Sequence, residues 1–411
     1  MDLLIEKRRN RYDVFLVLLI SSLAFCNVGG ALQISRLLAI LLTPTLLSKL
    51  HTCDRSITKV IDFLGLILLY LLFSLLWSFN QMRGVEELIY YGVHFILFLE
   101  MIVFARFSNQ PIHSIALGWT ISVAMTLVVA IWEITTDNHL SYSQQEAGLV
   151  SNLGHGIVVN RKFASVTFYN YNSYVTFLCF ALPFLYHRLK SVYKEYFREK
   201  VLMITVIALS IVCIIYNASR GGMISLIVIS LLYLFSNRSL KSSIKSLIFF
   251  IAIIGVVFFV FRNDILTAFM ARMEMSGSVG DESRWPIWQN GLRLLQDTYG
   301  FGPGVGGLTT GMERYAKNGI TITHNMILEL FLQFGSVFAL IILSKLWKLY
   351  KNLLKGVYGS LTLLMKMILF SLPIVAIIDS GYFLSPHFYA YCASIMIVSS
   401  TKYLNLQTDK L

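Results

Sequence analysis

Charged residues are scarce in this chain. Only 14% of its 411 residues are Asp, Glu, Lys or Arg, and 56% are hydrophobic, whereas soluble domains carry about 25% charged residues. Negatively charged residues are scarcer than positively charged ones, with 22 Asp and Glu against 34 Lys and Arg. The composition argues against a soluble protein and predicts an integral membrane protein.

Cysteine is also sparse. The five cysteines form no Cys-x-x-Cys pair, so neither a disulfide framework nor a metal site is expected. The polar loops contain no Asp-x-Asp or paired-carboxylate metal motif, and we expect no cofactor. The net charge of +12 does not indicate nucleic-acid binding, because Lys and Arg cluster in short loops between apolar runs.

Long apolar runs are what the sequence does contain. A helix needs about 20 mostly apolar residues to cross a bilayer. Twelve candidate runs occur, at 14–31, 32–49, 60–79, 88–106, 112–134, 168–187, 201–217, 221–236, 246–262, 324–344, 361–379 and 385–401. The sequence thus predicts an all-α integral membrane protein of about twelve transmembrane helices. The first run lacks a small-residue cleavage site and is expected to be retained. The seventh and eighth runs are short and closely connected, so this pair could instead form a broken or re-entrant element.

The basic residues are distributed unevenly between the two faces. The N-terminal side holds 22 of the 34 Lys and Arg, which predicts that both termini are cytoplasmic. The opposite face is rich in arginine: Arg36, Arg83, Arg161, Arg220, Arg262, Arg272, Arg284, Arg293 and Arg314, beside Lys162 and Lys317. Arginine binds phosphate through two parallel hydrogen bonds and keeps its charge. This face therefore suggests an anionic substrate such as a diphosphate, although some of these arginines are expected only to cap helices or pair with acids.

Two polar segments interrupt the alternating spans, and both fall on the outer face, at about 135–167 and 263–323. The second lies between the ninth and tenth runs and holds ten of the 26 glycines. Long loops in compact folds are usually functional. We divide the chain into N-terminal spans at 1–200, a core at 201–345 and C-terminal spans at 346–411.

Three local patterns at the outer face could carry chemistry. The first is Asn217-Ala218-Ser219-Arg220-Gly221-Gly222, where glycines let backbone N–H groups face an anion at the start of a helix; the alternative is a plain connecting turn. The second pattern combines Arg284, Trp285 and Trp288 with Arg293 and a glycine-rich stretch that includes Gly304. The tryptophans could dock a short helix at the interface or stack on sugars. The glycines allow close approach to a substrate or to another helix.

The third pattern is Thr323-His324-Asn325, which opens the tenth run. A histidine at the water boundary can accept a proton from a sugar hydroxyl. In the alternative, Thr323 or Asn325 caps the helix and His324 faces water. Glu329 lies inside the same apolar run, where a carboxylate is expected to be paired, with an arginine or with His324.

The order of these patterns resembles the bacterial O-antigen ligase and O-antigen polymerase superfamily. The resemblance covers roughly residues 200–345 and rests on Ser-Arg-Gly between two spans, a long outer loop with Arg284 before tryptophan, a glycine-rich stretch, and His-Asn opening the next span. One departure is Gln333, two positions before Gly335, where the family often has an acidic residue. Either Glu329 takes over the role of that acidic residue, or an acidic residue at this position is dispensable.

The resemblance implies a glycosyltransferase of the bacterial inner membrane that uses a lipid-linked donor. Its donor would be a glycan on undecaprenyl diphosphate, and its acceptor lipid A–core in a ligase or a growing glycan in a polymerase. Arg220 and Arg284 would hold the diphosphate, with Arg293 and Arg272 as competitors for the second position, and His324 would be the general base. Substrate contacts are expected from Ser219, Gly221, Arg293, Trp285, Trp288, Gly304, Asn325 and Glu329. The rival class is a lipid-linked-oligosaccharide flippase, which would need charged groups along a central path.

Overall fold

The computed structural model of the chain is a bundle of helices. It describes residues 9–143, 148–150, 158–160, 163–192, 197–236, 255, 259, 284–315, 321–354 and 360–408. Five helices in this part of the chain are long and apolar enough to cross a membrane, at Arg55–Trp77, Gln81–Phe107, Pro111–Thr136, Phe197–Tyr216 and Met326–Lys348. The chain is therefore an α-helical membrane protein, as the composition predicts.

The helices follow the predicted apolar runs. They are α1 (Arg11–Ser21), α2 (Ile34–Leu50), α3 (Arg55–Ser74), α4 (Gln81–Phe107), α5 (Pro111–Thr136), α6 (Tyr171–Val192), α7 (Phe197–Tyr216), α8 (Arg220–Phe235), α11 (Arg284–Asp297), α12 (Leu308–Glu313), α13 (Met326–Leu354), α14 (Ser360–Val375) and α15 (Pro386–Thr408). Short 3-10 turns continue α1 (η1, Ser22–Phe25), precede α2 (η2, Gly30–Leu32), continue α3 (η3, Leu75–Trp77) and precede α15 (η4, Tyr382–Leu384). Eleven of the twelve runs coincide with helices, and the ninth, 246–262, lies outside the described residues apart from 255 and 259. The number of spans stays a prediction.

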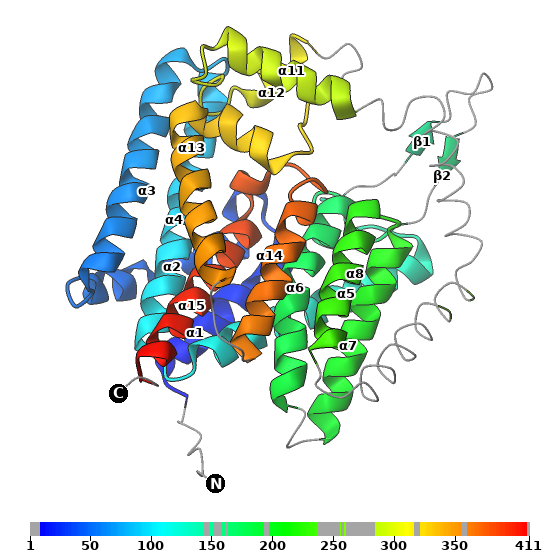
Figure 1. Ribbon diagram of the computed structural model, residues 1–411. Coiled ribbons are helices and arrows are strands. Elements are labelled where there is room, and N and C mark those ends of the chain that lie inside the picture. The colour runs from blue at the N-terminus through cyan, green and yellow to red at the C-terminus, as the bar shows by residue number, and fades with distance from the viewer. Residues whose placement is uncertain are drawn as a thin grey trace.

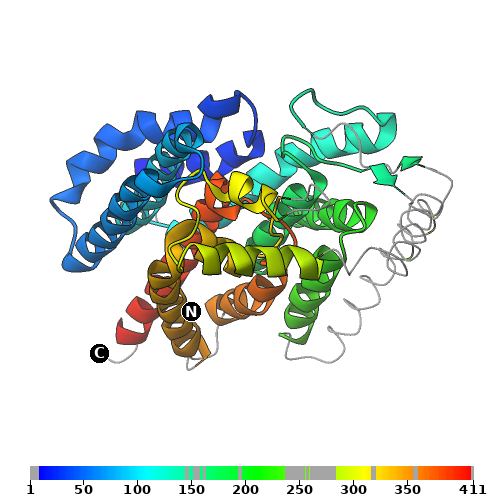
Figure 2. The same cartoon turned by 90° about the horizontal axis from the view of Figure 1, so that it is seen from above.

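The bundle has a clear top and bottom (Figure 1). The start of α1 and the end of α15 lie at the bottom, on the same side, and α11 and α12 lie across the top. Seen from above, α11 crosses the middle of the bundle, between α3 and α4 on one side and α6 to α8 on the other (Figure 2). The top is thus the face that the charge pattern assigns to the outside.

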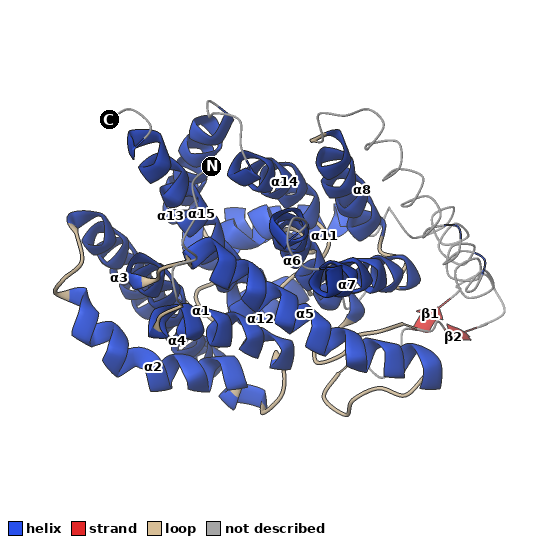
Figure 3. Cartoon of the chain, turned by 90° about the horizontal axis from the view of Figure 1, so that it is seen from below, coloured by secondary structure: helices blue, strands red, loops and turns tan. Residues whose placement is uncertain are grey.

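The first outer loop contains the only strands of the described residues. β1 (Gly148–Val150) pairs antiparallel with β2 (Val158–Asn160), and the pair lies at the edge of the molecule, far from α2 (Figure 3). Two strands of three residues do not change the all-helical character of the fold. They do show that the loop 135–167 has structure of its own, which its polar composition did not predict.

Helix α13 is broken near its outer end. Gly335 has φ 68° and ψ 164°, so residues 326–334 and 336–354 form two helical pieces. The Ser336 N–H, which lacks its helical partner there, donates to the Gly300 carbonyl at 2.7 Å. Tyr70 on α3 donates to the Phe301 carbonyl at 2.7 Å. The glycine-rich segment after α11 therefore fills the break in α13.

Candidate active site

The turn before α8 is anchored to the first outer loop. The Asn217 side chain is buried and pairs with the backbone of Ala164 in both directions, accepting from its N–H at 2.8 Å and donating to its carbonyl at 2.9 Å. Ala218 has φ +43°, an uncommon conformation for a residue with a side chain. Ser219 is buried at the N-cap position, without a side-chain capping bond.

Gly221 brings the start of α8 against the connection that follows α14. A Cβ atom at Gly221 would lie 2.7 Å from Ile378 Cγ1, a distance that real side chains do not reach. Only glycine allows this approach, which brings the backbone at the start of α8, where the exposed Arg220 is the first residue, against the 376–382 connection. Gly221 thus has a packing role here, beside any contact with an anion.

Arg284 reaches the same connection from above. Its Nη1 donates to the Ile377 carbonyl at 2.8 Å. The buried residues of α11, Ile287, Gly291 and Leu294, form one stripe that packs on α13, and a Cβ at Gly291 would lie 2.7 Å from Leu328 Cδ2. Arg284, three residues before Ile287, lies at the end of this stripe. The α11–α13 contact therefore aims Arg284 at the ends of α13 and α14.

Arg293 lies on the other side of α11. It follows Arg284 by nine residues, which is two and a half turns of about 3.6 residues each, so the two side chains leave the helix in opposite directions. Arg293 is exposed. The third candidate, Arg272, lies outside the described residues. Of the two arginines of α11, Arg284 is the one at the connection after α14.

Three sets of hydrogen bonds fix the loop that carries His324. Trp288 Nε1 donates to the Thr323 carbonyl at 3.1 Å. Asn325 Oδ1 accepts the N–H groups of Ile327 at 3.0 Å and Leu328 at 3.1 Å, so Asn325 is the cap of α13. The Met326 N–H donates to the Ala376 carbonyl at 2.8 Å. The capping role foreseen as an alternative for Asn325 is thus observed.

His324 itself is strained and poorly satisfied. Its φ is +46°, a conformation that costs of order 1–3 kcal/mol and persists only where the surroundings enforce it. Its Nδ1 is buried without a hydrogen-bond partner in the part of the chain that the structure describes. Burial, helped by the positive charge of Arg284, lowers the pKa of His324 to about 4. The imidazole is therefore neutral at neutral pH and can accept a proton.

Glu329 stabilises the backbone at the same place. Its carboxylate is buried, and Oε2 accepts the Gly381 N–H at 3.0 Å. Oε1 lies 3.5 Å from the Gln333 amide nitrogen, and Gln333 in turn accepts a hydrogen bond from Tyr91. The observed partners are thus a backbone N–H and an amide, and not an arginine or His324 as expected. Glu329 fixes the 376–382 connection that Arg284 contacts.

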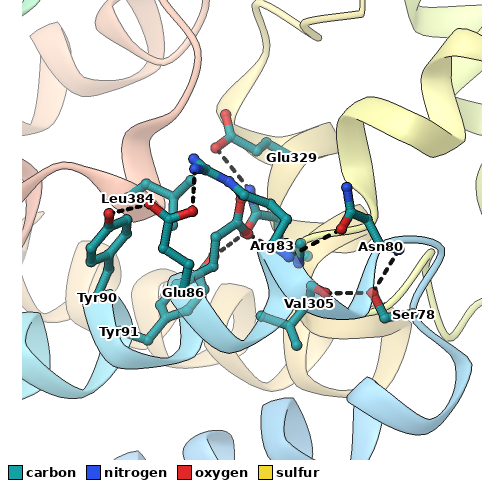
Figure 4. Close-up of polar contacts among 12 residues, drawn as sticks. Ser78, Asn80, Arg83, Glu86, Tyr90, Tyr91, Val305, Glu329 and Leu384 are labelled. Atoms are coloured by element: carbon teal, nitrogen blue, oxygen red, sulfur yellow. Dashed lines mark hydrogen bonds and ion pairs between the residues drawn. The ribbon is translucent and has the colours of Figure 1, made fainter. Parts of the chain in front are cut away.

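The glycine-rich stretch packs on the junction of α3 and α4. Ser78 Oγ donates to the Val305 carbonyl at 2.6 Å, and the Val305 N–H donates to Ser74 Oγ at 3.0 Å (Figure 4). A Cβ at Gly304 would lie 2.6 Å from the Ser74 carbonyl oxygen, and one at Gly306 2.2 Å from the Gly84 nitrogen. Of the two possibilities left open for these glycines, close approach to a helix is the one observed for Gly304 and Gly306.

Replacing Gly306 by alanine should destabilise the protein strongly. The residue has φ +75°, and its Cβ would collide with backbone that cannot move away. We expect a loss of about 2–3 kcal/mol of folding free energy, visible as a lower thermal unfolding midpoint in detergent. Gly30→Ala is the matched control, because Gly30 has φ +60° but nothing within 4 Å. Equal midpoints for the two variants would contradict the close approach.

Three of the outer arginines have structural partners. Arg36 is buried and donates to His94 Nε2 at 3.2 Å and to the Ala31 carbonyl at 3.0 Å. Arg83 pairs with Glu86 at 2.7 Å and Glu87 at 3.1 Å (Figure 4). Arg314 lies 3.8 Å from the Phe79 ring centre. Arg161 and Arg262 lie outside the described residues. Arg284 donates to the 376–382 connection, and Arg220 is the first residue of the helix that packs against it.

The tryptophans of α11 differ in exposure. Trp285 is 60% exposed, as expected for a side chain at an interface or on a sugar. Trp288 is half-buried, and its indole N–H donates to the Thr323 carbonyl. Trp288 therefore positions the His324 loop.

The sequence did not identify the connection 376–382 as part of the site. Its carbonyls accept from Arg284 and Met326, its Gly381 N–H binds Glu329, and its Asp379 is buried close to Ser173 and Asn170. These contacts are mostly backbone contacts, which leave no residue pattern. Asp379-Ser380-Gly381 at the end of an apolar run was the available signal.

Comparisons with known proteins agree with the motif order. Residues 205–343 match the family model described as O-antigen ligase, a range that contains Arg220, Arg284 and His324. The chain is also 22% identical over 319 residues to the teichuronic acid biosynthesis protein TuaE of Bacillus subtilis (strain 168). That alignment covers 72% of this chain and 62% of the length of the relative. Residues 205–343 are therefore similar to the O-antigen ligase family, and the rest of the chain lies outside the range that the family model matches.

Proposed function

We propose that this protein is a membrane glycosyltransferase that moves a glycan from undecaprenyl diphosphate to an acceptor sugar, at the outer face of the bacterial inner membrane, in surface polysaccharide biosynthesis. The observation that carries the proposal is the meeting of Arg284, the start of α8 and the His324 loop at one connection, 376–382. Two guanidinium groups and a neutral imidazole fit a diphosphate leaving group and a hydroxyl nucleophile. Both termini would be cytoplasmic.

The reaction follows from these roles. His324 takes the proton of the acceptor hydroxyl while the oxygen attacks C1 of the donor sugar. The bond from C1 to the diphosphate oxygen breaks, and the lipid diphosphate leaves with the electron pair. Arg220 and Arg284 neutralise the charge that grows on the diphosphate, which is electrostatic stabilisation aimed at the transition state. A single displacement from the opposite face inverts the configuration at C1. The residues assigned here need no metal ion.

The transporter alternative has less support. A flippase would need charged groups along a path through the bundle. Here Arg284, which acts on the charge state of His324, is the first residue of α11, and α11 lies across one end of the bundle (Figure 1). A transferase that works at one face explains this placement, and a path across the membrane does not.

Arg220→Ala tests the function in cells. We expect surface polysaccharide to fall by about 100-fold or more, because a donor to the developing charge is lost, while the amount of protein in the membrane stays unchanged. The gel also separates the two subtypes. Loss of a ligase leaves long chains on the lipid carrier and bare core on the surface, whereas loss of a polymerase leaves core with a single repeat. Normal polymer at normal expression would contradict the transferase assignment.

A further inference from the structure

A cavity of about 410 Å³ lies beside His324 on the outer face. Its remaining wall consists of Ser143, Tyr169, Asn170, Tyr171, Asn172 and Ile322. The volume falls within the range of about 300–1,000 Å³ that is usual for small-molecule sites. Apart from Ile322, the wall comes from the first outer loop and the residues up to the start of α6, which lie outside the range matched by the O-antigen ligase family.

Part of this wall is fixed by structural contacts. Asn170 Oδ1 accepts the Ser173 N–H at 2.9 Å, which caps α6. Asn170 and Ser173 also lie close to the buried Asp379 of the 376–382 connection. The Tyr171 ring lies 5.8 Å from that of Phe163. These contacts hold the wall against the 376–382 connection, and therefore against the site of Arg284.

The remaining side chains of the wall are available to a ligand. Tyr169 is 76% exposed and Asn172 is half-buried. Within the described residues, neither side chain has a hydrogen bond, ion pair or ring contact, and His324 Nδ1 has no hydrogen-bond partner. An exposed phenol ring, a free amide and an unsatisfied imidazole thus surround one space.

The chemistry of these groups fits a sugar. An aromatic ring offers an apolar surface for the C–H face of a pyranose, and an amide can both donate to and accept from neighbouring hydroxyls. None of the described side chains that line the cavity is a carboxylate, lysine or arginine, so this lining suits a neutral, hydroxyl-rich ligand. Arg284, which the proposed function assigns to the diphosphate, donates to the Ile377 carbonyl and does not line the cavity.

We propose that this cavity is the acceptor subsite, in which Tyr169 stacks on the acceptor sugar, Asn172 binds its hydroxyls, and one hydroxyl faces His324. The inference rests on the proposed transferase function and adds the acceptor-binding residues to it. Because Tyr169 and Asn172 lie outside the segment that carries Arg220, Arg284 and His324, acceptor choice and bond-breaking chemistry use largely separate parts of the chain.

The test is a transfer assay with the full-length protein in phosphatidylethanolamine–phosphatidylglycerol vesicles. The donor is the lipid-linked glycan extracted from the producing cells, and the acceptors are oligosaccharides from partial hydrolysis of their surface polysaccharide. Undecaprenyl diphosphate serves as an inhibitor that reports on the donor site. Tyr169→Ala and Asn172→Ala should each raise the half-saturating acceptor concentration about tenfold, with unchanged inhibition by undecaprenyl diphosphate.

Two variants serve as controls. Tyr169→Phe keeps the ring and should stay within about twofold of wild type, since stacking is retained. Tyr299→Ala removes another exposed tyrosine of the outer segment, 90% exposed, which does not line the cavity, and should have no effect.

The outcomes separate the subsite from the function. Transfer by the wild type with no change in acceptor dependence in Tyr169→Ala and Asn172→Ala would overturn the subsite alone. Weaker inhibition by undecaprenyl diphosphate in these variants would assign the cavity to the donor, and would also overturn it. Absence of transfer by the wild type would reject the proposed function together with the subsite.

Discussion

Arg284→Ala is expected to reduce the rate of glycan transfer by about 100- to 1,000-fold. The side chain lies beside His324 and is fixed by its bond to the Ile377 carbonyl, so it is oriented before the substrate arrives. Such a group needs little reorganisation when charge develops on the diphosphate, which is why its removal is costly. The measurement is the initial rate of transfer from the lipid-linked donor in vesicles.

Two further variants make this result specific. Arg293→Ala removes an exposed arginine from the opposite side of the same helix and should change the rate less than about twofold. Arg284→Lys keeps the charge but loses the planar fork, so it should recover only part of the rate. Equal rates for Arg284→Ala and Arg293→Ala would show that Arg284 has no special role.

His324→Gln should reduce the same rate by about 100- to 10,000-fold, the usual contribution of a general base. Glutamine has similar size and can hydrogen-bond but cannot take the proton. Because Asn325 caps α13 and the Thr323 and Met326 backbone groups hold the loop, we expect the thermal unfolding midpoint to change little. A large drop in that midpoint together with the rate would indicate a structural role instead.

The pH profile distinguishes a base from a positioning residue. Only the neutral imidazole can accept a proton, so kcat/KM should fall as the pH drops through the pKa of His324, about 4. Between about pH 5 and 7 the wild-type value should be flat, whereas an unperturbed histidine would lose activity near pH 6.5. Arg284→Gln removes a nearby positive charge that lowers this pKa, so its acid limb should move to higher pH. An acid limb unaffected by Arg284→Gln would argue against His324 as the base.

The helices were predictable because their signal is local. A run of apolar residues long enough for a bilayer identifies a span by itself, and eleven runs became helices. Asn325 as a cap and a short helix around Trp285 and Trp288 also follow from nearby residues. Arg284 could not be separated from Arg293 and Arg272 by sequence, because the choice depends on which face of α11 packs on α13.

The partners of the polar groups were less predictable. Glu329 was expected to bind an arginine or His324, but it binds the N–H of Gly381. Almost every residue has a backbone N–H, so the residue types in the sequence do not reveal such a partner. The glycines near Gly304 could have served a substrate or a helix, and their use depends on Ser74 and Gly84, more than 200 positions earlier. The acceptor wall at 169–172 was missed because Tyr and Asn at the start of an apolar run resemble an ordinary helix entry.

The break in α13 has a consequence for how the protein is made. In a bilayer, each main-chain N–H must find a partner inside the protein. At Ser336 that partner is the Gly300 carbonyl, in a segment that precedes the helix in the chain and that, in the proposed orientation, folds on the far side of the membrane. Helix α13 therefore cannot complete its hydrogen bonding during insertion. Export of the preceding segment and its docking on α3 must come first, so biogenesis of this half of the protein follows a fixed order.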